Sequence, residues 1–173
     1  MKKFISCLSA LVLCFSLVIV GCLDVKAEGI EDLGKIVDGS KLINEKYSEK
    51  IAMPLTRGNI LNQGLARITN NENGTVNIYG AAFGSVTCDK ITIKLTLQQY
   101  RNGSWYNYGT YSDVAYNTST YSRSWNVGVS SGYYYRIKAV CSAQKGGTTE
   151  SQAPVTDGLW IRTANKANLL IFK

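Results

Sequence analysis

Histidine is absent from this 173-residue chain, and its absence removes more chemistry than any other feature of the composition. Histidine is the usual general base at neutral pH, a member of the common nucleophilic triads and the commonest zinc ligand. Paired carboxylates could replace it. Between residues 58 and 161, however, the acids are few and form no recognisable pair motif: Glu72, Asp89, Asp113, Glu150 and Asp157. We therefore expect no enzyme, with no catalytic residues, no cofactor and no metal site.

Other missing signals limit the partners. The chain has no basic block, no zinc-finger spacing and no RNA-binding signature, so a nucleic acid is not expected as its target. A Leu-Pro-x-Thr-Gly sorting motif is also missing, and the last apolar run, residues 169–172, is far too short to span a membrane. The formal charge is +7, and its positive surplus suits either an anionic surface or ordinary solubility.

The N-terminus carries the pattern of an export signal. Lys2 and Lys3 precede an apolar run over residues 4–23, and Val25-Lys26-Ala27 offers a small-x-small exit before Glu28. Residues 1–27 are therefore predicted to be a signal peptide, and the mature protein to be secreted. Ile19-Val20-Gly21-Cys22 also resembles a bacterial lipobox, in which Cys22 would be lipidated and would anchor the chain to a membrane. An uncleaved membrane helix is a further alternative.

Cysteine counting becomes simple once the leader is set aside, because only Cys88 and Cys141 then remain. Two cysteines in an oxidising compartment predict one disulfide. This bridge would close a loop of about 50 residues and contribute on the order of 4 kcal/mol in the chain-entropy model. Two buried free thiols are the alternative.

The mature chain divides by composition. Residues 28–57 are polar and charged and predict a flexible arm or linker, although a short helix over residues 40–51 is also possible. Residues 58–161 show strand-length segments between glycine and asparagine turns, and residues 162–173 form a tail. The clearest strand covers residues 90–99, where Ile91, Ile93, Leu95 and Leu97 share one face. Such alternation predicts one packed face and one solvated face.

Turn signals set the expected strand order. Asn73-Gly74 and Asn102-Gly103 predict type I′ hairpin turns, and Lys145-Gly146-Gly147 marks a third turn. The expected strands cover residues 60–69, 75–82, 90–99, 105–112, 121–129, 133–144 and 150–161. Seven strands in this length predict an all-β fold, an antiparallel immunoglobulin- or fibronectin-III-like β-sandwich, preceded by the signal peptide and flexible arm.

Two resemblances follow from longer motifs. The stretch Gly132-Tyr133-Tyr134-Tyr135-Arg136-Ile137-Lys138-Ala139-Val140 resembles the sixth strand of fibronectin type III sandwiches, which implies that Tyr133 is the structural tyrosine-corner residue. More of the chain resembles a family of small secreted Gram-positive bacterial proteins with a domain of unknown function. That resemblance rests on Asp38-Gly39-Ser40, Arg57-Gly58, Gly64, Leu97-Gln98, Gly103-Ser104-Trp105, Gly132 to Arg136, Thr148 to Ser151 and Thr156 to Ile161, and it implies no catalytic residues.

Aromatic residues are the remaining distinctive chemistry. Strand alternation from Trp105 to Tyr111 predicts that these two residues share one face and that Tyr106 and Tyr108 share the other. Exposed rings beside amides suit carbohydrate or cell-wall polymer, and Arg136 and Lys138 could hold an anionic polymer. The expected ligand surface is Trp105, Tyr106, Tyr108, Tyr111, Tyr134, Arg136 and Lys138.

The aromatic rings could also simply fill half-buried strand positions, without any ligand. The function expected from the sequence is a secreted, non-catalytic binding or surface-interaction module. A protein-adhesion module and a small exported antimicrobial or toxin component are the alternatives. A membrane is a partner only if Cys22 is lipidated, and the oligomeric state is left open.

Overall fold

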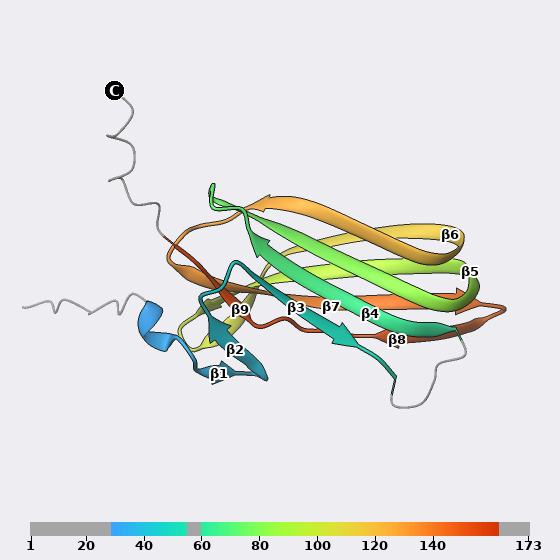
Figure 1. Ribbon diagram of the computed structural model, residues 1–173, viewed down its shortest axis with the longest axis horizontal. Helices are drawn as coiled ribbons and strands as arrows, with labels where there is room; N and C mark the ends of the chain where they lie inside the picture. The colour runs from blue at the N-terminus through green and yellow to red at the C-terminus, as the bar shows by residue number, and fades with distance from the viewer. Residues whose placement is uncertain (1–28, 55–59, 163–173) are drawn as a thin grey trace, which may run out of the picture.

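The computed structural model describes residues 29–54 and 60–162, and this part of the chain is built almost entirely of β-strands (Figure 1). A single 3₁₀ turn (Ile30–Asp32) precedes the first strand. Among these residues, no helix has the length and apolar character needed to cross a membrane. The strands are β1 (Ile36–Val37), β2 (Ser40–Ile43), β3 (Tyr47–Ala52), β4 (Leu61–Asn70), β5 (Thr75–Arg101), β6 (Ser104–Gly128), β7 (Tyr133–Lys145), β8 (Thr148–Gln152) and β9 (Gly158–Ile161).

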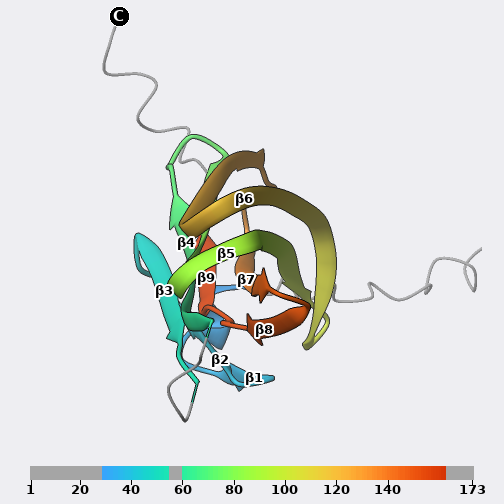
Figure 2. The ribbon, with the colours of Figure 1, turned by 90° about the vertical axis from the view of Figure 1, so that its right-hand side faces the viewer.

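One long hairpin, β5–β6, organises the sheet. The first part of β5 pairs with β4 and with the end of β6, whereas its second part, from Cys88 onward, pairs with β7 and the start of β6. The β5–β6 pairing is irregular between Phe83 and Cys88, and Figure 2 shows both strands curving strongly. The sheet therefore curls into two limbs. The first limb contains β3, β4 and the first part of β5. The second contains β7, β8, β9 and the remainder of β5.

The core fills the space between the two limbs. Ile91, Ile93, Leu95 and Leu97 are fully buried, which confirms the alternation seen in the sequence. Gly80, in the first part of β5, faces the second part of the same strand, and a Cβ on it would lie 2.7 Å from Ile93 Cγ2. The two halves of β5 thus pack face to face. Burial of apolar side chains between the limbs is the main favourable contribution to folding.

The prediction of an all-β fold is confirmed, but a seven-stranded antiparallel sandwich does not describe the sheet. Nine strands occur in the described residues, and β2 runs parallel to β9 through Leu42↔Gly158 and Ile43↔Leu159. Strands expected at 75–82 and 90–99 are one strand, as are those expected at 105–112 and 121–129. The segment expected at 150–161 is instead divided into β8 and β9. Sequence alternation could not show that a strand bends without ending.

Three strands of the sheet, β1, β2 and β3, lie within the stretch expected to be a flexible arm. Six residue pairs join β3 to β4, and β2 joins β9. Leu42 is fully buried against a second, smaller apolar cluster with Tyr100, Tyr134 and Trp160. This cluster lies on the outer face of the second limb, which the β1–β2 hairpin covers. A helix over residues 40–51 is not formed.

The three turns behave differently. Asn102 and Gly103 both have positive φ (49° and 76°), as the predicted type I′ turn requires. Gly146 and Gly147 make a similar turn between β7 and β8 (54° and 83°). The hairpin at Asn73-Gly74 forms with a longer loop, in which Glu72 and Gly74 have the positive φ values.

The predicted disulfide is not formed, because Cys88 and Cys141 are both free and buried. Cys141 pairs across the sheet with Ile93, five residues along β5 from Cys88. At about 3.3 Å per strand residue, the two cysteines lie roughly 16 Å apart, far beyond the span of a disulfide. Burial raises the pKa of the Cys141 thiol to about 11 and also raises that of Cys88.

The leader with Cys22 and the tail from residue 163 onward lie outside the described residues.

Candidate functional site

The structure does not place the seven expected ligand residues on one surface. Tyr106, Tyr108 and Tyr111 lie on the side of β6 that faces the core, and the first two are exposed near the strand end. The other four lie on the outer face of the second limb, where Tyr134 and Arg136 are buried, Trp105 is partly buried and Lys138 is exposed: Trp105, Tyr134, Arg136 and Lys138.

A β-bulge at Tyr108 causes this division. Leu97 pairs with Gly109, but the next residue of β5, Gln98, pairs with Asn107, so Tyr108 is an extra residue. An inserted residue moves each side chain beyond it in the strand to the opposite face of the sheet. Trp105 and Tyr111 therefore lie on opposite faces, contrary to the sequence prediction. Gly109, directly after Tyr108, is the sequence signal for this bulge, because an isolated glycine inside a strand often marks one.

Arg136 is a buried internal contact, with 2% of its surface exposed. Its Nε donates to Gln98 Oε1 at 2.9 Å, and its Nη1 donates to Ser40 Oγ at 2.9 Å and to the Asp38 backbone oxygen at 3.0 Å. Its Nη2 donates to Asp38 Oδ2 at 2.6 Å, and this hydrogen bond, with the guanidinium charge, lowers the pKa of Asp38. Arg136 thus attaches the β1–β2 turn to the outer face of the second limb.

A shallow groove of about 340 Å³ opens beside this contact. The Trp105 ring lies 4.4 Å from the Arg136 guanidinium carbon, and its Nε1 donates to the Val37 backbone oxygen at 3.1 Å. Gln98 Nε2 donates to Asn107 Oδ1 at 2.9 Å. The groove walls are therefore held by hydrogen bonds, but most of their polar atoms already have hydrogen-bond partners within the protein.

The expected tyrosine-corner bond is made by Tyr135 instead of Tyr133. The Tyr135 hydroxyl donates to the Ser130 backbone oxygen, five residues upstream, at 2.9 Å. Gln99 Nε2 donates to the same hydroxyl at 2.7 Å. Tyr135 is fully buried, and this burial raises its pKa to about 12. Three consecutive tyrosines gave no signal to choose among them.

Beyond the groove, the outer face of the second limb is polar and basic. We call it the lysine face. It is formed by side chains that point away from the core on four neighbouring strands and that include three lysines, many hydroxyl groups and no acid: Lys90, Thr92, Lys94 and Thr96 of β5, Thr110, Ser112, Val114 and Tyr116 of β6, Lys138, Val140, Ser142 and Gln144 of β7, and Thr149 and Ser151 of β8.

The lysines of this face make no ion pair within 4.0 Å in the described residues, although the charge of Lys138 adds to the effect of Arg136 in lowering the pKa of the nearby Asp38. Lys90 and Lys94 lie about 13 Å apart along β5, and Lys138 is diagonal to Lys94 at roughly 8 Å. Tyr116, 66% exposed, is part of the same face. Sequence reasoning identified only Lys138, because the shared face of the three lysines depends on how β5 pairs with β7.

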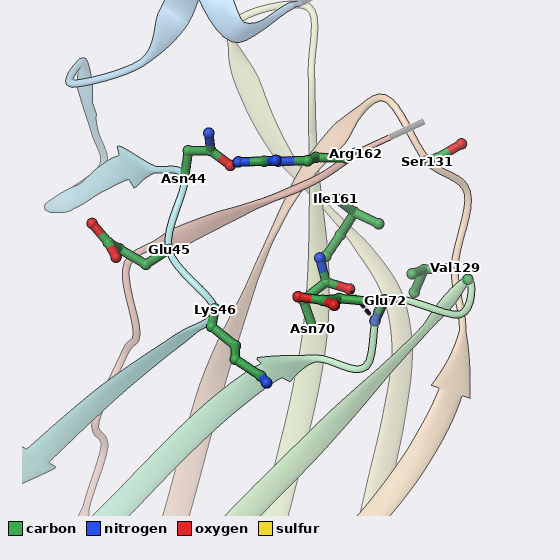
Figure 3. A pocket seen from close by; sticks show the side chains of 10 residues that line it. Asn44, Glu45, Lys46, Asn70, Glu72, Val129, Ser131, Ile161 and Arg162 are labelled. Atoms are coloured by element: carbon green, nitrogen blue, oxygen red, sulfur yellow. Dashed lines mark hydrogen bonds between the residues drawn. The ribbon is translucent and has the colours of Figure 1, made fainter. Parts of the chain in front are cut away.

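A second concave feature lies at one end of the sheet, where four chain segments meet (Figure 3). We call it the loop-end cleft. It has a volume of about 460 Å³, and its lining is mostly polar and of both charges: Asn44, Glu45, Lys46, Asn70, Glu72, Gly74, Val129, Ser131, Ile161 and Arg162. No residue of this cleft was singled out as a ligand contact from the sequence.

Four of the five acids between residues 58 and 161 accept hydrogen bonds from backbone amides and so help to hold the fold. Glu150 Oε2 accepts hydrogen bonds from the backbone amides of Ile60 and Leu61, at 3.0 and 2.8 Å. Asp89, Asp113 and Asp157 likewise accept bonds from backbone amides. In residues 29–54 and 60–162, no group of three or more cysteine or acidic side chains is placed to hold a metal ion.

Comparison with known proteins returned no matching family model, no matching curated protein and no matching solved structure. The resemblance to small secreted Gram-positive proteins therefore stays a prediction.

Proposed function

We propose that this protein is an exported, non-catalytic binding module whose lysine face takes anionic carbohydrate-based polymers. The observation that carries the proposal is a set of three lysines, Lys90, Lys94 and Lys138, that make no ion pair in the described residues and share a face whose own side chains include no acid. The ligand chemistry is a chain of sugars or polyols bearing repeated carboxylate or phosphate groups.

The shape of the face suits an extended polymer better than a small molecule. Its side chains come from four adjacent strands, and hydroxyl groups lie between the lysines. Hydroxyls can donate and accept hydrogen bonds, so they match the polar edges of sugars. The exposed ring of Tyr116 offers an apolar surface on which a sugar ring can stack.

The proposed site differs from the aromatic surface expected from the sequence. Tyr134 and Arg136 are too buried to contact a polymer directly, and Tyr106 and Tyr108 lie on the other side of the sheet. Of the expected residues, Lys138 belongs to the lysine face and Trp105 lines the adjoining groove.

Structural use of the carboxylates supports a non-catalytic role. Asp89, Asp113, Glu150 and Asp157 bind backbone amides, and the chain has no histidine. A pair of carboxylates acting on a glycosidic bond would need one acid and one base placed on either side of the substrate.

Binding to two anionic polymers and one neutral polymer tests this function. Polygalacturonate and poly(glycerol phosphate) should bind the purified protein, with affinity that falls as salt is raised, whereas dextran should not. Each exposed ion pair contributes about 0.5–1 kcal/mol, so removing three should weaken binding roughly ten- to a hundredfold. The test variant is K90Q/K94Q/K138Q.

A matched control removes the same charge elsewhere, in exposed lysines of the N-terminal strands and the segment before them: K35Q/K41Q/K50Q. It should bind as the wild type does. Equal losses in the two triple variants would show that only net charge matters and would reject the lysine face.

Export itself is tested by the mass of the mature N-terminus. A chain beginning at Glu28 would indicate soluble release, and a lipid-modified chain beginning at Cys22 would indicate membrane anchoring. If the protein isolated from its native cells still begins at Met1, soluble release and lipid anchoring are both contradicted.

One observation favours protein adhesion as a second candidate function. Among the described residues, β6 pairs only with β5, so its other edge lacks a partner strand along all 25 residues. An unpaired edge is a template for an added strand from another chain. Within β6, only Asp113 and Arg123 carry charge, and no proline or lysine blocks pairing. Loss of partner binding on placing proline in β6, with polymer binding retained, would support this function.

A further inference from the structure

We infer that the loop-end cleft binds a small dipolar ligand that carries both an ammonium and a carboxylate group, such as an amino acid or a short unblocked peptide. This site is separate from the lysine face and does not depend on the polymer-binding proposal. Its residues lie at one end of the sheet and on different connections of the chain.

The walls of the cleft are held together by backbone hydrogen bonds. The amide of Asn70 donates to the Lys46 oxygen at 2.9 Å, which joins the β2–β3 connection to the end of β4. Val129 donates to Gly74 at 3.0 Å, and Gly132 donates to Ile161 at 2.7 Å. These bonds connect all four segments, so the cleft is formed before any ligand enters. Preformed sites lose less entropy on binding.

The cleft contains opposite charges that do not neutralise each other. Lys46 and Glu72 both line it, but no ion pair within 4.0 Å joins them or engages either one in the part of the chain that the structure describes. Arg162 is directed instead to an amide, with Nε donating to Asn44 Oδ1 at 3.4 Å. A ligand with both charges could satisfy the carboxylate and the ammonium at once, which neither a simple cation nor a simple anion can do.

The backbone holds Glu72 in an unusual conformation at this place. Its φ of 62° lies in the left-handed region, which glycine and asparagine adopt far more readily than glutamate. The Glu72 amide donates to Asn70 Oδ1 at 2.9 Å, which fixes the turn. Figure 3 shows the Glu72 carboxylate beside Asn70 within the cleft, with the Lys46 ammonium extending from the opposite wall.

The size and polarity of the cleft agree with such a ligand. Its volume of about 460 Å³ is within the usual range for small-molecule sites. Val129 and Ile161 add an apolar patch that suits a short aliphatic group, and Ser131 adds a hydroxyl at the edge. No aromatic ring lines the cleft, so a stacked sugar is a poorer match.

Titration of the purified full-length protein with glycylglycine tests this inference. Binding is measured by calorimetry and by shifts of the backbone amide signals in NMR spectra. We expect saturable binding with shifts at residues around Lys46, Glu72 and Ser131. N-acetylglycine amide, which lacks both charges, should not bind. Ethylamine and acetate test the two charges separately, and tight binding of either one alone would overturn the dipolar ligand.

Two single variants identify the charges involved. E72Q and K46Q should each weaken glycylglycine binding at least about tenfold, because each removes one charge-assisted contact. E31Q and K41Q change the same charges at exposed positions outside the cleft and should have no effect. Unchanged binding in both E72Q and K46Q would overturn the site.

The two proposals fail separately. The lysine-face variant K90Q/K94Q/K138Q should bind glycylglycine normally, and E72Q should bind polygalacturonate normally. Urea unfolding of E72Q and K46Q shows whether either change alters the fold. If either variant unfolds, the NMR shifts of the wild-type protein decide the question, because shifts confined to other regions would reject the cleft.

Discussion

At the scale of single residues, close approach between the two limbs limits which side chains fit. Gly64, in β4, faces the second limb, and a Cβ on it would lie 2.9 Å from Gln152 Cβ and 3.1 Å from Cys141 Cβ. Both neighbours are the first atoms of their side chains, so they cannot rotate away. A larger residue at this position must therefore separate strands.

We expect Gly64→Ala to lower the free energy of unfolding by about 1–3 kcal/mol, as overpacking of a core does. Urea denaturation measures the change. Gly128→Ala is the matched control, since a Cβ there meets no atom within 4 Å, and its stability should equal that of the wild type or exceed it slightly. Equal stability of the two variants would mean that the limbs do not approach as described.

The second residue-scale prediction concerns the Tyr135 hydroxyl. Tyr135→Phe removes its bonds to the Ser130 oxygen and Gln99, and leaves the buried Gln99 amide unpaired. We expect a loss of about 1–3 kcal/mol. Tyr133→Phe, at a partly buried position, should change stability by less than about 0.5 kcal/mol. A larger loss from Tyr133→Phe would return the tyrosine-corner role to Tyr133.

The same hydroxyl makes stability depend on alkaline pH. The Tyr135 pKa is raised from 10 to about 12, so the folded state favours the protonated phenol. Its contribution is complete below pH 10 and is lost as the pH rises toward about 12. The difference in unfolding free energy between wild type and Tyr135→Phe should therefore shrink over this interval. A constant difference would contradict the raised pKa.

At the scale of elements, the β1–β2 hairpin is attached to the outer face of the second limb largely by hydrogen bonds. Besides the short parallel pairing with β9 and the buried side chain of Leu42, Arg136 bonds to Asp38 and Ser40, and Trp105 donates to the Val37 oxygen. Ser40 Oγ also donates to the Thr156 oxygen, and the Lys41 amide donates to Asp157. Displacing the hairpin would expose the apolar cluster that includes Tyr134, whose hydroxyl is buried without a hydrogen bond. Among the described residues, this hydroxyl is the one buried side-chain polar group that lacks a hydrogen-bond partner.

We expect acid to loosen this hairpin. The pKa of Asp38 is lowered by Arg136, so the stabilisation is present above the ordinary value of 3.8 and is lost as the pH falls through the lowered value. Asp38→Asn should give the same loosening at neutral pH. Hydrogen exchange of residues 36–43 measures both effects. Asp32→Asn, which removes an exposed ion pair with Lys35, is the control and should leave the exchange unchanged.

At the scale of the whole molecule, the placement of β5 against β7 decides the state of the cysteines. With Cys88 and Cys141 roughly 16 Å apart, oxidation cannot join them without unfolding the sheet. We expect both thiols to be recovered free by mass spectrometry of their peptides and to react with alkylating agents only after denaturation. A reductant should not alter the unfolding midpoint. A disulfide-linked peptide, or a stability loss of about 4 kcal/mol on reduction, would refute the pairing of β5 with β7.

Much of the local structure could be predicted from the sequence. Alternation over residues 90–99 predicted the buried face of β5, and Asn102-Gly103 predicted its hairpin turn, because side-chain periodicity and φ preference are local properties. The absence of histidine limited the chemistry without any coordinates. Asp38-Gly39 carries the same hairpin signal, with φ values of 49° and 75°, and it forms the β1–β2 turn within the stretch expected to be a flexible arm.

Only the tertiary structure decided how these pieces combine. The bend in β5, the bulge at Tyr108 and the parallel pairing of β2 with β9 depend on contacts between residues far apart in the chain. They in turn decided that Arg136 is buried, that Lys90, Lys94 and Lys138 share a face, and that Lys46 and Glu72 line one cleft. A pattern within one strand shows which side chains alternate, whereas strand pairing and sheet curvature determine which face is covered and which charges meet.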